Sequence, residues 1–366
     1  MTSKGPKMLL SEKLVKSLSS SIDAALVTSV QNRLYFSSFE SHCGYFLVMR
    51  DGTAYSLMDF RYYESALNQV KDSEVVLFRD IKITLKDLAS KHKIKRIAVE
   101  RNDLTLKELR KFEDLFKESD VIVTADGELD CAIAAMRCIK SEKEIEKIIA
   151  SQKITEQSFE QVLSQIKPGI TTELEIALDL EFDMRKNGAS SVSFDFIVVS
   201  GKKTSMPHGK PGNKKIENNE FLTLDIGAVF DGYHSDMTRM VSVGKLSEEE
   251  LKIYDIVLNA QLRGIESVRA GVAAKDVDKA VRNFIKDQGY SEYFGHSTGH
   301  GVGLDVHEDP RISETDETIL ESGMIITIEP GIYLPGKFGV RIEDMVVVTK
   351  DGCKNLTNIT KKLITI

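Results

Sequence analysis

The chain has 366 residues, which is too long for one ordinary core and suits two domains. Its net charge of −7 and pI near 5.7 argue against nucleic acid or an anionic membrane as the main partner. The sequence contains no long apolar run that could span a membrane, and Met1–Ser19 lacks the apolar core of a secretory signal. We therefore expect a cytoplasmic protein, with the stretch before Met8 as a flexible leader.

The first third of the sequence alternates short apolar runs with charged helical stretches. Tyr45–Met49 is a predicted strand closed by the turn dipeptide Asp51-Gly52, and Ile97–Val99 and Val121–Val123 are further predicted strands. No catalytic pattern is found in this part of the sequence. We expect a smaller α/β domain over residues 1–136.

The domain boundary is expected close to a helix start signal. Ser141 and Glu144 occupy the N-cap and N3 positions of a capping box, so a long amphipathic helix should follow. We place the second domain at residues 137–366.

The second domain repeats itself loosely. Two predicted helices end near Gly188 and Gly289, and the segments that introduce them begin at residues 167 and 269. Two further pairs of short motifs recur in the same order and at a similar offset. These motifs are Asp225-Ile226-Gly227 with Glu329-Pro330-Gly331, and Asp236-Met237 with Glu343-Asp344-Met345. Matches in the same order predict a duplicated helix-plus-hairpin unit.

The hairpin of the first repeat brings two aspartates together. Asp231-Gly232 predicts a two-residue turn, and the resulting register pairs Asp225 with Thr238. Asp225 and Asp236 then share one face of the sheet as diagonal neighbours, roughly 7–8 Å apart at Cα. Two side chains at that spacing can close onto one ion.

The hairpin of the second repeat is expected to bring two glutamates together. If its loop is symmetric about Gly336, Glu329 lies opposite Glu343. Like charges in that position are destabilising unless a cation lies between them. A single acidic residue is usually a surface group with a salt-bridge partner. Asp225 and Glu329, however, each end an apolar strand where a buried carboxylate needs compensation, so the set predicts a metal site.

A glycine-rich segment between the two acidic pairs carries three histidines, His296, His300 and His307. Glycine lets the backbone approach a ligand closely, and imidazole is a common metal ligand. Four carboxylates and one imidazole carry four negative charges, which two divalent cations would neutralise. Oxygen-rich ligation suits Mn²⁺, Co²⁺ or Mg²⁺, and the absence of thiolates argues against a structural zinc.

At these residues the sequence resembles the pita-bread metallopeptidases of family M24. The resemblance favours the Xaa-Pro branch, which includes aminopeptidase P and prolidase, and it is carried by the blocks at 225–227, 232–239, 296–308, 329–333 and 340–344. It covers residues 137–366, and the first domain also resembles the one that this branch carries. The implied fold is α+β: a C-terminal pita-bread domain with an internal pseudo-twofold duplication, preceded by a smaller creatinase-like α/β domain.

The resemblance also implies a ligand set. The expected metal ligands are Asp225, Asp236, His300, Glu329 and Glu343. Asp236 and Glu343 would bridge two ions, Asp225 would hold one of them, and His300 with Glu329 would complete the other. We expect Mn²⁺, with Co²⁺ or Zn²⁺ as alternatives.

Further roles follow from the same resemblance. Glu329 would act as general base, His208 would lie near the leaving nitrogen, and His307 would face the scissile carbonyl. Arg341 would support the carboxylates. Further candidates beside the metals or the substrate are His296 and Tyr233.

The implied activity is that of an Xaa-Pro aminopeptidase acting by metal-hydroxide attack on peptides with a free N-terminus. The dipeptidase, prolidase, is the alternative, and a non-catalytic pita-bread binding module is another. Creatinase-type hydrolysis shares the fold but not the five ligands. The family implies a homodimer.

Overall fold

The computed structural model describes residues 8–366, so the leader expected before Met8 lies outside the described residues. The chain divides into two compact units, one ending at Arg137 and the other beginning at Cys138. Between residues 8 and 366, every helix is too short or too polar to cross a lipid bilayer.

The first unit is built around a mixed six-stranded sheet with the strand order β4-β3-β2-β1-β5-β6. Its strands are β1 (Ala24–Val27), β2 (Tyr45–Met49), β3 (Ala54–Met58), β4 (Glu74–Leu77), β5 (Arg96–Val99) and β6 (Ile122–Thr124). Its helices are α1 (Leu10–Ser17), α2 (Val30–Ser37), α3 (Phe60–Gln69), α4 (Ile81–Lys91), α5 (Leu106–Phe116) and α6 (Glu128–Cys138). The predicted strand Tyr45–Met49 is confirmed residue for residue, Ile97–Val99 lies within β5, and Val121–Val123 overlaps β6, which begins and ends one residue later.

The second unit contains two larger sheets, ordered β20-β12-β9-β8 and β14-β13-β15-β18-β19, and two small ones, β11-β10-β7 and β16-β17. Its helices are α7 (Glu142–Leu163), α8 (Glu173–Lys186), α9 (Glu248–Ser267) and α10 (Ala274–Asp287), with short 3-10 helices η1 (Gly201–Ser205) and η2 (Ser291–Tyr293). The strands up to the first long hairpin are β7 (Ser191–Val192), β8 (Ile197–Ser200), β9 (Glu220–Ile226), β10 (Ala228–Phe230), β11 (Tyr233–His234) and β12 (Met237–Val243). The remaining strands are β13 (Gly299–Gly301), β14 (Glu308–Ile312), β15 (Ile325–Ile328), β16 (Gly331–Leu334), β17 (Phe338–Arg341), β18 (Asp344–Val348), β19 (Cys353–Asn355) and β20 (Ile364–Thr365).

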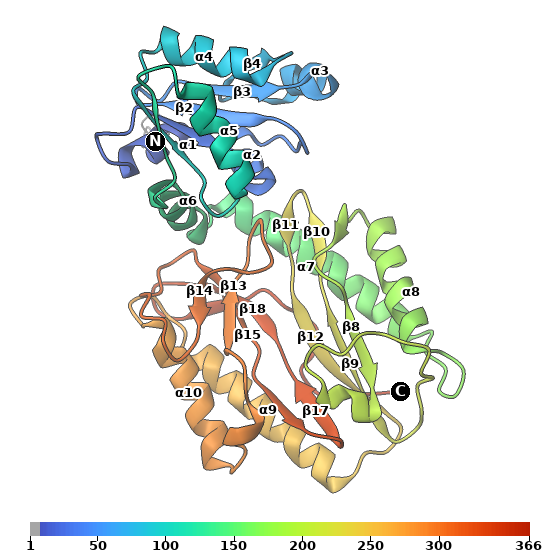
Figure 1. Ribbon diagram of the computed structural model, residues 1–366. Coiled ribbons are helices and arrows are strands. Elements are labelled where there is room, and N and C mark those ends of the chain that lie inside the picture. The colour runs from blue at the N-terminus through green and yellow to red at the C-terminus, as the bar shows by residue number, and fades with distance from the viewer. Residues whose placement is uncertain (1–7) are drawn as a thin grey trace, which may run out of the picture. The chain divides into compact units, whose positions relative to one another are not determined.

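The second unit repeats one order of elements, as the sequence predicted. A long helix, a second helix and three antiparallel strands form each half: α7, α8, β8, β9 and β12, then α9, α10, β13, β15 and β18. Helix α8 begins at residue 173 and α10 at residue 274. Figure 1 shows α7 and α8 along the first set of strands and α9 and α10 along the second.

The start and end signals of the helices act as expected. The Ser141 amide and hydroxyl donate to the Glu144 carboxylate, at 2.8 and 2.6 Å, and this capping box opens α7. Gly188 and Gly289 follow α8 and α10 with φ values of 105° and 84°. Because these φ values belong to the left-handed region, glycine ends both helices without strain.

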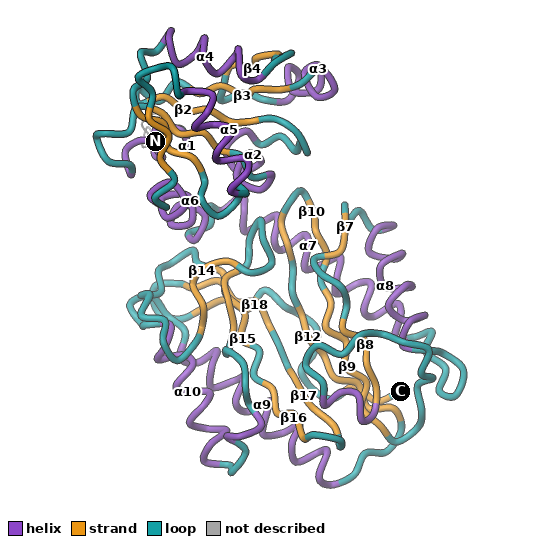
Figure 2. The backbone as a smooth tube through the Cα atoms, in the orientation of Figure 1, coloured by secondary structure: helices purple, strands orange, loops and turns teal. Residues whose placement is uncertain are grey.

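The alternation of side chains along β9 determines which face of the sheet carries Asp225. In β9, Leu222, Leu224 and Ile226 pack into an apolar core with α7 and α8. Alternate residues of a strand point to opposite faces, so Asp225 points away from those helices. Figure 2 shows the helices of this unit on the outside of its strands. The carboxylates therefore face the side of the sheet that the helices leave uncovered.

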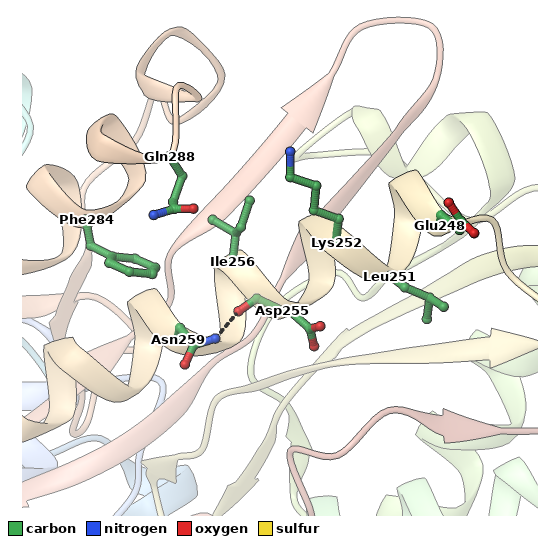
Figure 3. A pocket seen from close by; sticks show the side chains of 8 residues that line it. All are labelled: Glu248, Leu251, Lys252, Asp255, Ile256, Asn259, Phe284 and Gln288. Carbon is green, nitrogen blue, oxygen red and sulfur yellow. Dashed lines mark hydrogen bonds between the residues drawn. The ribbon is translucent and has the colours of Figure 1, made fainter.

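A shallow groove of about 500 Å³ lies on the outer surface, between α9 and α10 (Figure 3). Leu251, Ile256 and Phe284 are among its lining side chains, and none of the candidate site residues lines it.

Candidate metal centre

The first hairpin has the predicted register. Asp225 pairs with Thr238, and Ile226 pairs with Met237. The turn residues Asp231 and Gly232 both have positive φ, 51° and 81°, which is the type I′ geometry that suits a two-residue hairpin. The turn therefore fixes which face of the hairpin carries Asp225.

The second hairpin is symmetric about Gly336, also as predicted. Ile328 pairs with Asp344, and beyond the interruption Gly331 pairs with Arg341. Both pairs follow one register, which sets Glu329 across from Glu343. The structure differs from the sequence expectation in one respect. The hairpin is divided between two sheets at this point, so both glutamates leave regular strand pairing.

Asp236, His300 and Glu343 bring one ligand atom each to within 4.8 Å of the other two. His300 Nε2 lies 3.6 Å from Asp236 Oδ2 and 3.2 Å from Glu329 Oε1. Asp225 lies close enough for its charge to raise the pKa of Asp236, and Arg341 donates to its carboxylate. The five residues named from the sequence thus lie in one buried neighbourhood, although the tight three-atom group contains only three of them.

The buried carboxylates of this group are costly to ionise without a nearby positive charge. Burial raises the pKa of Asp236, and the charges of Asp225 and Glu329 raise it further. Burial and the surrounding carboxylates likewise raise the pKa of Glu343 well above its usual range. Burial alone would lower the pKa of His300, but its hydrogen bond to Glu329 and the charge of Asp236 raise it to about 9. The protonated imidazole supplies one of the missing charges.

A divalent cation fits the residues present. Oε1 of Glu343 is buried and has no hydrogen-bond partner within residues 8–366, which is costly for a carboxylate oxygen. Carboxylate oxygens with one imidazole form a donor set for hard or borderline divalent ions. An ion among Asp236, His300 and Glu343 would satisfy the orphaned oxygen and displace the imidazole proton.

Several neighbours orient the carboxylates. Thr238 donates to Glu343 Oε2 at 2.7 Å, and Arg341 Nη1 donates to the Tyr333 hydroxyl at 2.7 Å. The same hydroxyl lies 3.0 Å from His296 Nε2. The predicted register places Thr238 opposite Asp225, but we predicted no role for its hydroxyl at Glu343. Nothing local to the sequence marks Tyr333 as a bridge between Arg341 and His296.

Of the other candidate residues, His307 lies beside His300, whereas Tyr233 contacts α7 and His208 is exposed. The His307 ring lies 4.4 Å from that of His300, nearly perpendicular to it, and burial with the His300 charge lowers the pKa of His307. His208 is exposed in the loop between β8 and β9. The Tyr233 hydroxyl donates instead to Glu144 of α7, 3.1 Å away. That hydrogen bond ties Tyr233 to the helix that packs behind the hairpin.

Comparisons with known proteins identify the family of the chain. Residues 146–350 match the model of metallopeptidase family M24, and residues 12–139 match the creatinase/prolidase N-terminal domain. The chain therefore belongs to metallopeptidase family M24. It is an α+β protein whose pita-bread domain follows a creatinase-type N-terminal domain, as the sequence predicted.

Three relatives are similar over nearly their whole length. An Xaa-Pro dipeptidase of Pyrococcus horikoshii is 36% identical over 371 residues, covering 97% of this chain and 99% of that protein. A solved Xaa-Pro dipeptidase from Bacillus anthracis is 39% identical with a TM-score of 0.92, and a solved X-Pro aminopeptidase from Thermotoga maritima is 38% identical with a TM-score of 0.89. Each of these two structures covers 97% of this chain and is itself covered to 99%.

Proposed function

We propose that this peptidase hydrolyses Xaa-Pro dipeptides with two divalent metal ions. The observation that carries the metal chemistry is the convergence of Asp236, His300 and Glu343 around an unpartnered carboxylate oxygen. This proposal puts the dipeptidase, the alternative implied by the sequence, before the aminopeptidase. Relatives named Xaa-Pro dipeptidases support the dipeptidase over the aminopeptidase.

The ligand assignment in this proposal is the one that the resemblance implies. Asp225, Asp236, His300, Glu329 and Glu343 would hold the ions, with Mn²⁺ as the expected metal. When bound, divalent ions supply Lewis-acid chemistry, which lowers the pKa of water and polarises a carbonyl.

In this proposal Glu329, His307 and His208 have separate roles in hydrolysis. Burial alone would raise the pKa of Glu329, but in the metal-free protein the His300 hydrogen bond lowers it, so this carboxylate is ionised before an ion binds. As the proposed general base, it would accept a proton from the attacking water. The neutral His307 donates a hydrogen bond to the oxygen that becomes negative, a contact worth roughly 3–4 kcal/mol in comparable sites. His208 faces the leaving nitrogen in this proposal.

Arg311 gives the dipeptide preference a physical basis. It pairs with His300 across β13 and β14, so its side chain shares a sheet face with that histidine, and its charge contributes to the lowered pKa of His307. The Arg311 side chain is exposed, and within residues 8–366 it has no ion-pair partner. A dipeptide carries its terminal carboxylate only one residue beyond the scissile bond, where a free cation would bind it.

The X-Pro aminopeptidase relative keeps the second candidate open. Hydrolysis of a matched set would separate the two: an Xaa-Pro dipeptide, the same dipeptide with a C-terminal amide, and an Xaa-Pro tripeptide, each assayed with added Mn²⁺. We expect the dipeptide to be preferred over its amide by about tenfold or more in kcat/KM, the equivalent of about 1.4 kcal/mol. Equal or faster cleavage of the tripeptide would favour the aminopeptidase.

The homodimer expected from the resemblance stays part of this proposal. Light scattering on the purified protein would test it, because a mass of one chain at assay concentration would rule the dimer out.

A further inference from the structure

Glu173, the first residue of α8, is a fully buried carboxylate that the metal centre does not use. Its Oε1 accepts from the Ser200 amide at 2.8 Å and the Ser200 hydroxyl at 3.2 Å, and its Oε2 accepts from Lys203 Nζ at 2.7 Å and the Gly212 amide at 3.1 Å. A buried carboxylate with four donors is fully satisfied, so it holds its partners firmly.

These donors come from the two ends of one loop. Ser200 ends β8, and Gly212 lies on the return path toward β9. The backbone also ties the return path to α8, because the Leu174 amide donates to the Gly212 carbonyl at 3.0 Å. Glu173 thus closes the segment 200–212, and His208 lies inside it.

The far side of the same loop contacts the metal centre. The Gly339 amide donates to Thr204 Oγ1 at 2.9 Å, and a side chain at position 339 would collide with the Thr204 carbonyl. Arg341, which also holds Asp225, has Nη1 3.4 Å from the Pro207 carbonyl oxygen. The residue before His208 is therefore held by the same guanidinium that orients a candidate metal ligand.

In the second half of the domain, a similar lysine–glutamate pair contacts the loop that carries His307. Lys140 Nζ lies 3.0 Å from Glu308 Oε2, and Glu308 Oε1 accepts from the Asp305 amide at 3.1 Å. This loop follows β13 and carries His307, as the loop after β8 carries His208. In both repeats, a lysine pairs with a buried glutamate that contacts the loop bearing the histidine, although Lys203 is partly exposed whereas Lys140 is buried.

We propose that Glu173 is a positioning residue, which closes the loop 200–212 and thereby places His208 against the substrate's leaving nitrogen. This inference rests on the proposed function, because the role of His208 comes from it. Glu173 touches neither metal ligands nor substrate; it acts through the backbone of the loop.

Glu173→Gln tests the proposal with little change in shape. The amide group turns an NH₂ toward Lys203 and the Gly212 amide, both of which are donors, so one end of the loop loses its acceptor. We expect kcat for an Xaa-Pro dipeptide to fall about tenfold or more, with metal content and KM nearly unchanged. Amide hydrogen exchange should become faster across 200–214 and stay unchanged across α10, residues 274–287, which packs against α9 in the other half of the domain.

A control and a double variant separate positioning from general stability. Glu175→Ala removes the capping partner of Thr172 at the same helix end without touching the loop, and it should leave kcat unchanged. If Glu173 acts through His208, Glu173→Gln combined with His208→Ala should be no slower than His208→Ala alone. Multiplied losses in the double variant would overturn the proposal.

Two further outcomes are informative. If Glu173→Gln does not fold, Lys203→Met removes one donor and should give a smaller change in the same direction; unchanged exchange in the loop would contradict the inference. If the wild-type protein does not cleave Xaa-Pro substrates at all, the proposed function fails. In that case the exchange comparison still decides whether Glu173 orders the loop.

Discussion

The Thr238 hydroxyl donates a 2.7 Å hydrogen bond to Oε2 of Glu343, while Oε1 of that carboxylate is buried and, within residues 8–366, has no hydrogen-bond partner. One oxygen is fixed by the partner hairpin and the other is left for a ligand. This asymmetry is what a metal-binding carboxylate requires, because its orientation must be set before the ion arrives.

Replacement of this carboxylate should separate stability from function. Glu343→Gln replaces a carboxyl group that burial and the neighbouring carboxylates make costly to ionise with a neutral amide that can donate to a neighbouring carboxylate. We expect the metal-free variant to unfold with a free energy about 1 kcal/mol higher than that of the metal-free wild type, while its metal content and activity fall at least a hundredfold. Urea unfolding with chelator and elemental analysis would check both. Lower stability together with full metal content would contradict the assignment.

Metal binding should release protons. The pKa of His300 is raised to about 9 by Glu329 and Asp236 against the effect of burial, so its imidazole is protonated at pH 7 in the metal-free protein. A divalent ion must displace that proton, and affinity should therefore rise with pH up to about 9, by roughly tenfold per pH unit for each proton released. Titration calorimetry in two buffers of different ionisation enthalpy measures the release, and identical heats in both would refute it.

We expect the Tyr333 hydroxyl to support activity through its hydrogen bonds to Arg341 and His296. It joins Arg341 to His296, so Tyr333→Phe leaves a buried guanidinium with one acceptor fewer. We expect kcat/KM to fall about five- to tenfold, the equivalent of about 1 kcal/mol, with metal content unchanged. Tyr254→Phe is the matched control, because that hydroxyl donates to the Lys361 carbonyl, outside the site. Equal losses in the two variants would point to stability alone.

Arg311 should determine how the substrate's terminal carboxylate is recognised. Arg311→Met is expected to raise KM for an Xaa-Pro dipeptide about tenfold and to leave the C-terminal amide of that dipeptide unaffected. Arg269→Met, at an exposed arginine before α10, serves as the control. A KM change of equal size for dipeptide and amide would show that Arg311 does not read the carboxylate.

The sequence predicted the parts of the site that local chemistry fixes. Asp231-Gly232 and the symmetry about Gly336 determine two registers, and each register follows from its own turn. The break of the second hairpin at Glu329 was not predictable, because it depends on packing between strands far apart in the chain. Arg311 was missed for the same reason: only the pairing of β13 with β14 brings it beside His300.

We propose above all that the clustered carboxylates and His300 hold divalent ions needed for hydrolysis of Xaa-Pro bonds. The most direct measurement is the rate of Xaa-Pro dipeptide hydrolysis by chelator-treated protein, before and after Mn²⁺ is added back. The account predicts a loss of at least a hundredfold after chelation and recovery with Mn²⁺. Hydrolysis at the untreated rate in excess chelator would contradict it.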